Sequence, residues 1–143
     1  MTMSDAAPRV QALHDALQTT YDLYRATHLA HWNVRGPQFP QLHLMFETQY
    51  NELWLALDAV AERIRSLGAS VDPKAMTGAS TQVPADAAGM VRTLAKGNRA
   101  AAETLRGLVK LATDAGDDAT ADLATQRIAA HEQAAWMLEA ILE

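Results

Sequence analysis

Imidazole, carboxylate and aromatic side chains share one face of the segment 42–67, if that segment forms a helix. They are His43, Glu47, Tyr50, Trp54, Asp58 and Glu62. The chain has no cysteine, so any metal site must be built from nitrogen and oxygen donors. Asp58 and Glu62 lie one helical turn apart and could reach the same ion. The pattern therefore indicates metal chemistry.

The alternative interpretation of this face is a solvated surface, because charged residues on the outer side of a helix need no further explanation. Tyr50 and Trp54 argue against it, since large aromatic side chains outside the core are typical of a surface that another subunit covers. Carboxylates enclosed in such a contact need cations, protons or a metal to compensate their charge. We interpret the face as a subunit interface that contains a metal.

One chain cannot bring all the candidate ligands together. His31 and His43 bracket a predicted turn, but His43 and Asp58 are fifteen residues apart on one helix, or about 22 Å. Ligands of one ion must lie within roughly 2.0 to 2.6 Å of it. If two copies of the helix pack antiparallel about a two-fold axis, the two histidines of one copy meet Asp58 and Glu62 of the other. The site then requires a dimer with two equivalent centres.

A site inside a four-helix bundle, built from Glu-x-x-His pairs, is the competing arrangement. The residues three positions before the five histidines are Gln11, Arg25, His28, Pro40 and Ile128. None is glutamate, so the sequence excludes this in-bundle di-iron site.

Four long helices must position these residues. Apolar residues recur at steps of three and four over about 8–34, 42–67, 86–115 and 118–142. Gly36, Pro37 and Pro40 break the first pattern, and Gly68 stands where a C-terminal cap is expected. We expect His14, His28 and His131, which fall on or near apolar stripes, to be hydrogen-bonded core residues.

The connection 68–84 is long enough to run the whole length of a bundle. Asp72 and Pro73 could start a short helical piece that Gly78 ends. Two short turns and one long connection predict an all-α, ferritin-like four-helix bundle with one crossover between its second and third helices. The whole chain, 1–143, is expected to be one domain.

Composition excludes several classes of protein. The chain is 49% apolar and 20% charged, and seven glycines and five prolines are few for a β-sandwich of tight turns. The formal charge of -5 is not typical of proteins that bind nucleic acids, which carry an excess of basic residues. No apolar run is long enough to span a membrane, and the first residues lack a basic segment followed by an apolar core. We therefore expect a cytoplasmic protein.

Two parts of the sequence resemble signatures of the Dps family, the miniferritins named as DNA-binding proteins from starved cells. The first is the run His31-Trp32-Asn33-Val34-Arg35-Gly36, continued by the spacing His-x11-His-x14-Asp-x3-Glu to Glu62. The second is Asp118-Ala119-Thr120-Ala121-Asp122 together with His131-Glu132 and Trp136-Met137-Leu138. The resemblance covers the first, second and fourth predicted helices.

The resemblance implies a dodecameric shell. Its centres between subunits would bind Fe²⁺, oxidise it to Fe³⁺, preferably with hydrogen peroxide, and deposit ferric mineral in the cavity. His31 and His43 would be ligands from one subunit, and the partner would supply Asp58 and Glu62, the latter bridging two ions. The family commonly has aspartate at the position of Glu47, near a weaker iron site.

Three further residues have family counterparts and also simpler interpretations. Trp32 resembles a tryptophan thought to absorb radical damage, although interface packing explains it as well. Asp118 and Asp122 resemble acidic residues that line three-fold pores for iron entry. Helix N-terminal carboxylates favoured by the macrodipole are the alternative. The segment from Glu103 onward has eight acidic and three basic residues, which favours the pore.

Direct DNA binding is not expected, because the first nine residues contain one arginine against one aspartate, and phosphate contacts need mobile cations. Two other functions stay open at this point. One is a structural helical oligomer without ferroxidase activity. The other is a pigment- or cofactor-binding bundle with Trp32, Trp54 and Trp136 as pocket walls.

Overall fold

The computed structural model describes residues 3–77 and 82–143. Its four long helices are α1 (Met3–Asn33), α2 (Phe39–Ser66), α3 (Ala87–Asp114) and α4 (Asp118–Ile141), with the short 3-10 helix η1 (Pro73–Met76) between α2 and α3. The described residues contain no strand. The predicted all-α class is confirmed.

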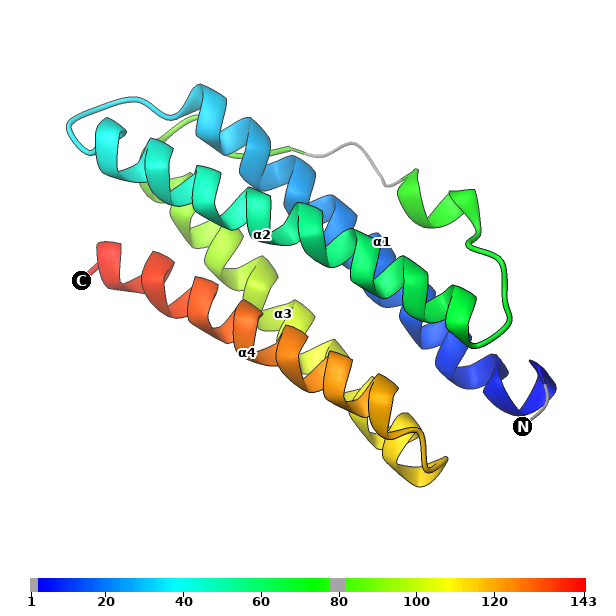
Figure 1. Cartoon of the computed structure of the whole chain (residues 1–143). Helices are drawn as coiled ribbons and strands as arrows, with labels where there is room; N and C mark the ends of the chain where they lie inside the picture. The colour runs from blue at the N-terminus through cyan, green and yellow to red at the C-terminus, as the bar shows by residue number, and fades with distance from the viewer. Residues whose placement is uncertain (1–2, 78–81) are drawn as a thin grey trace.

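The helices pair as α1 with α2 and α3 with α4, each pair antiparallel and joined by a short turn (Figure 1). Because α2 ends at the opposite end of the bundle from the start of α3, the connection between them runs along the bundle (Figure 1). This is the single crossover that the sequence predicts. The side chain of Asp72 accepts a hydrogen bond from the Lys74 amide and caps η1. Gly78, the predicted end of this piece, lies outside the described residues.

The apolar stripe of α2 explains why this helix packs inward along its whole length. Leu42, Phe46, Leu53, Val60 and Ile64 are all at most 3% exposed. They contact apolar side chains of the other helices in a core that extends from end to end of the bundle. The spacing of three and four residues therefore predicts the buried face correctly.

Local chemistry explains some of the helix ends but not the starts of α1 and α2. Asp86 caps α3 through a hydrogen bond from the Gly89 amide, close to the predicted start. The predicted start at residue 8 is wrong, because Pro8 lies inside α1. Proline is tolerated in a first turn, but here two buried residues, Ala6 and Arg9, hold the preceding turn against the bundle. Pro40, which was expected in the turn, lies in the first turn of α2.

Two glycines with positive φ make the chain reversals next to α2. Gly36 has φ 108° in the turn between α1 and α2, and Gly68 has φ 92° just after α2. Residues with a Cβ rarely adopt this conformation, which explains the two positions. None of the described helices combines the length and the apolar character that crossing a membrane requires.

Candidate metal centre

His31 and His43 face each other across the turn between α1 and α2. His31 lies in the last turn of α1 and His43 in the second turn of α2, and Gly36 lets the chain reverse between them. The two imidazole rings stack with their centroids 3.8 Å apart and their planes inclined by 14°. The structure therefore brings together the two histidines that the sequence predicts as ligands from one chain.

Reciprocal hydrogen bonds fix these rings. His31 Nδ1 lies 2.8 Å from the backbone oxygen of His43, and His43 Nδ1 lies 2.7 Å from the backbone oxygen of His31. A carbonyl oxygen only accepts, so each Nδ1 must carry the proton and donate. In the neutral ring the other nitrogen, Nε2, then carries the lone pair, and this tautomer is the one that binds a metal through Nε2. The pair is a preformed set of two nitrogen donors.

The candidate carboxylates lie elsewhere on α2. Asp58 and Glu62 are exposed near its C-terminal end, fifteen and nineteen residues after His43, and fifteen residues of helix span about 22 Å. Within the described ranges of one chain, no three histidine, aspartate or glutamate side chains come close enough to hold an ion. The meeting of histidines and carboxylates from two chains stays a prediction.

The stripe that carries these carboxylates lies outside the core. Trp54 is 58% exposed and Asp58 and Glu62 are exposed, whereas Glu47 and Tyr50 are half-buried. Leu44 and Leu55, on the same side of α2, are also exposed. A single chain therefore presents an aromatic and apolar surface next to its candidate ligands, as is typical of a covered interface.

Similarity to known proteins covers nearly the whole chain. The ferritin-like domain family matches residues 10–143. A DNA protection during starvation protein of Brevibacillus brevis is 37% identical over 129 residues, which are 85% of this chain and 85% of that protein. The crystal structure of a Dps protein from Bacillus brevis, 33% identical, covers all of both chains with a TM-score of 0.90. The chain belongs to the Dps family.

Another Dps structure, from Vibrio cholerae O1, superposes with a TM-score of 0.92 at 28% identity and covers 100% of this chain and 94% of that one. That protein is described as a member of a broad superfamily of ferritin-like diiron-carboxylate proteins. The fold predicted from helix and loop lengths is thus the fold of the Dps family.

Aromatic rings surround the histidine pair in this Dps-family chain. The His28 ring lies 3.8 Å from that of Trp32 and 4.1 Å from that of Tyr50, centroid to centroid. Burial lowers the pKa of His28, and the nearby His31 lowers it further. His28, expected as a hydrogen-bonded core residue, is instead a half-buried member of this aromatic cluster. Trp32 packs on His28 and is 61% exposed, which leaves its radical-trapping role a prediction.

The other two histidines do make hydrogen bonds. His131 is 2% exposed and its Nδ1 lies 2.8 Å from the side-chain oxygen of Asn98. Burial, followed by the charge of Arg127, lowers the pKa of His131 to about 3. His14 Nδ1 pairs with the Val10 backbone oxygen, and its Nε2 accepts from the Asp72 amide. His14 is half-buried, so only His131 matches the expectation of a core residue fully.

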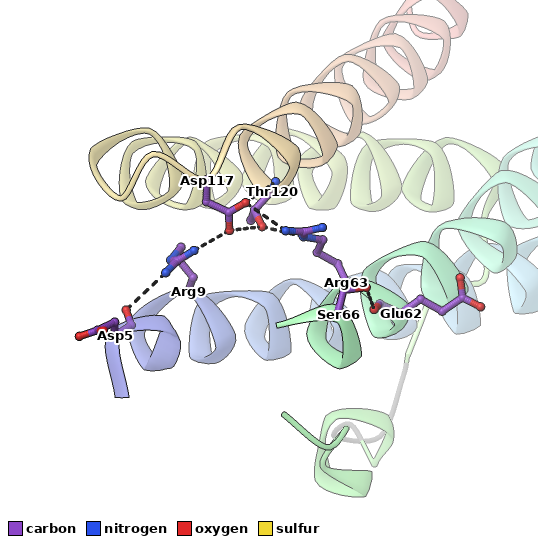
Figure 2. Close-up of polar contacts among 7 residues, drawn as sticks. All are labelled: Asp5, Arg9, Glu62, Arg63, Ser66, Asp117 and Thr120. Carbon is purple, nitrogen blue, oxygen red and sulfur yellow. Dashed lines mark hydrogen bonds and ion pairs between the residues drawn. The ribbon is translucent and has the colours of Figure 1, made fainter. Parts of the chain in front are cut away.

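A buried carboxylate that the sequence analysis missed ties three helices together beside Glu62. Asp117 caps α4 by accepting from the Thr120 amide and hydroxyl, and it also accepts from Arg9 of α1 at 2.6 Å and Arg63 of α2 at 3.1 Å. Figure 2 shows both arginines directed at this carboxylate while Glu62, next to Arg63, points away from it. We call Arg9, Arg63, Asp117 and Thr120 the α1–α2–α4 clasp.

The clasp fixes the end of α2 that carries Glu62 against the start of α4. Burial opposes ionisation of Asp117, but the hydrogen bonds from Thr120 and Arg9 and the charge of Arg63 outweigh burial and keep its pKa below the ordinary value. Asp118 and Asp122 follow on exposed positions of α4, and Asp122 accepts from Gln126 at 2.7 Å. The signal for Asp117 in the sequence was its position just before a predicted helix, where aspartate is a preferred cap.

Proposed function

We propose that the protein is an iron-storing and iron-detoxifying member of the Dps family, with the whole chain, 1–143, as one subunit domain. Its substrate is Fe²⁺, which it oxidises at centres between two subunits and stores as ferric mineral within a twelve-subunit shell. With hydrogen peroxide, two Fe²⁺ each give one electron, the O–O bond breaks, and two protons complete two waters. Oxygen is the alternative oxidant.

The observation that carries this proposal is the histidine pair with its free Nε2 lone pairs. Two imidazoles at one end of an interface-like face, and two carboxylates at its other end, are the nitrogen and oxygen donors that suit ferrous iron. The carboxylates of Asp58 and Glu62 would also balance the two positive charges of the ion. Glu47, half-buried on the same face, is the candidate ligand for a second iron.

Peroxide consumption at such a centre would remove two reactants together. Paired oxidation of Fe²⁺ keeps the ion from reducing peroxide by one electron, which would release a radical. Asp118 and Asp122, exposed at the start of α4, would attract Fe²⁺ toward the shell through their negative charge. Trp32, beside the centre, would accept an oxidising equivalent that escapes it.

Mixing two inactive variants tests the two-chain centre directly. His31→Ala removes a nitrogen donor and Asp58→Ala an oxygen donor, so each pure variant should oxidise Fe²⁺ slowly when apo protein is mixed anaerobically with Fe²⁺ and peroxide. If equal amounts of the two variants assemble at random, about half of the subunit pairs are mixed, and in each mixed pair one of the two centres is intact. Co-assembly should therefore restore roughly a quarter of the wild-type rate. An exposed carboxylate far from the face, Asp114→Ala, is the control.

The same mixture separates this function from its alternatives. A centre within one chain gives no recovery on mixing, and a purely structural oligomer gives ferric absorbance at equal rates in wild type and variants. DNA protection by direct binding is not part of the proposal, because a net charge of -5 opposes contact with phosphates. A stable complex with DNA in a gel shift at low salt would contradict that part.

A further inference from the structure

The exposed face of α2 has the pattern of a helix–helix seam. Its residues recur at steps of three and four: Leu44, Glu47, Asn51, Leu55, Asp58 and Glu62. Leu44 and Leu55 are 62% and 70% exposed in the single chain, and Asn51 between them is exposed as well. Two leucines that flank a central polar residue are typical of the contact line between two packed helices.

The positions on this face are symmetric about Asn51. Glu47 and Leu55 are each four residues from Asn51, and Leu44 and Asp58 are each seven residues from it. An antiparallel copy centred on Asn51 therefore sets Leu44 opposite Asp58 of the partner subunit and Glu47 opposite Leu55 of the partner subunit. Leu44 and the partner's Leu55 are then offset by only three residues, about 4.5 Å along the helix, and can still pack together. The occupant that fits the face is a second copy of the same helix.

The candidate ligands point independently to the same centre. The midpoint between residues 43 and 58 falls between residues 50 and 51, so the register that brings the histidines to the partner's carboxylates also sets Asn51 beside its own copy. A groove of about 430 Å³ alongside Leu55 and Asp58, lined also by Val71 and Met76, lies where Leu44 of the partner subunit would pack. Shape and the spacing of His43 and Asp58 agree on one register.

We propose that Asn51 is the positioning residue that fixes this register on the two-fold axis. The proposal rests on the two-chain centre of the proposed function. A carboxamide both donates and accepts, so two copies related by a two-fold axis can exchange hydrogen bonds. A slip of one turn, about 5.4 Å, would set each amide beside Leu55 or Glu47 of the partner subunit, depending on its direction, and would move His43 by the same distance from its place beside the partner's Asp58.

Cysteine cross-linking tests the register without iron, because the chain has no cysteine of its own. On the axis, the two copies of an Asn51→Cys variant should lie within the Cα separation of a disulfide, about 4.4 to 6.8 Å, and mild oxidation should convert most of the protein to a covalent dimer. Leu44→Cys is the matched control, exposed on the same face. Its two copies should lie about 21 Å apart along the helices and stay unlinked.

A metal measurement tests the positioning role. Calorimetry with Co²⁺ on the apo protein should give wild-type affinity for Asn51→Ser, whose hydroxyls can still pair across the axis, and binding weakened about tenfold for Asn51→Leu. Native mass spectrometry should show Asn51→Leu still assembled, because leucine adds apolar contact. Equal Co²⁺ affinity in both variants would overturn the proposal.

The cross-linking result separates this proposal from the proposed function. Cross-linking specific to Asn51→Cys in a protein that does not oxidise Fe²⁺ supports the register and contradicts the ferroxidase. Active protein in which Leu44→Cys links as fully as Asn51→Cys, or in which Asn51→Cys does not link, contradicts the register alone.

Discussion

Replacing Asp117 with asparagine should destabilise the protein strongly, although Asp117 is not one of the candidate metal ligands. Its side chain is 4% exposed and accepts from Arg9, which is 3% exposed, and from Arg63, which is 25% exposed. Removing one partner of a buried ion pair costs about 3–5 kcal/mol. We expect about 3 kcal/mol for Asp117→Asn, because Arg63 reaches solvent and the amide oxygen still accepts. In a chain of this size that lowers Tm by about 10 °C.

The matched control is an ion pair on the surface. Glu139 pairs with Arg99 at 2.9 Å, but the two side chains are 43% and 46% exposed, so solvent screens the pair and Glu139→Gln should lower the Tm very little. Thermal unfolding followed by circular dichroism, at pH 7 and equal subunit concentration, compares the two variants. A Tm loss in Asp117→Asn no larger than in Glu139→Gln would refute the reasoning.

The pH dependence of this difference has a definite sign. The pKa of Asp117 is below its ordinary value in the folded protein, so the folded state favours the carboxylate. Its stabilisation is complete above the unfolded pKa of about 3.9 and is lost as the pH falls through the lower folded value. The gap in Tm between wild type and Asp117→Asn should therefore be constant from pH 7 to about 5 and should close in acid.

Three other outcomes follow from the described contacts. The imidazole of His131 should show no NMR titration between about pH 5 and 8, since its pKa is about 3; a transition near the ordinary histidine value would contradict its burial. Gly36→Ala should lower the free energy of unfolding in urea by about 1–2 kcal/mol, because φ is 108° and nothing crowds a Cβ there; an unchanged midpoint would show that the turn relaxes. His43→Asn, whose amide can replace the Nδ1 donor to His31 but not Nε2, should keep the thermal stability of the apo protein and lose Co²⁺ binding, whereas equal losses of both would show a structural role only.

Local sequence patterns predicted the structure correctly where residues close together in the sequence determine it. The start of α3 follows from Asp86 as a cap, and the buried stripe of α2 follows from the spacing of its apolar residues. The approach of His31 to His43 was predictable too, because only a short turn separates the two helices that carry them. These features depend on contacts close along the chain.

Contacts distant along the chain could not be predicted in this way. The partners of Asp117 in the clasp, Arg9 and Arg63, lie 108 and 54 residues away, and nothing in local spacing connects them. The early start of α1 has the same origin, since Arg9 holds the turn around Pro8. The exchange of hydrogen bonds between the two histidines depends on the exact approach of two helix ends, which residue types alone do not specify.

Because the two histidines are already paired within one subunit, the proposed metal centre would be completed in two steps. In the proposed centre a lone subunit already offers two nitrogen donors, whereas the oxygen donors and their charge would come only with association. Thermodynamic linkage requires that a bound ion strengthens subunit association by the same factor by which association strengthens ion binding. Subunit association and iron binding would then strengthen each other. A low concentration of subunits would weaken iron binding, and a low concentration of iron would weaken subunit association.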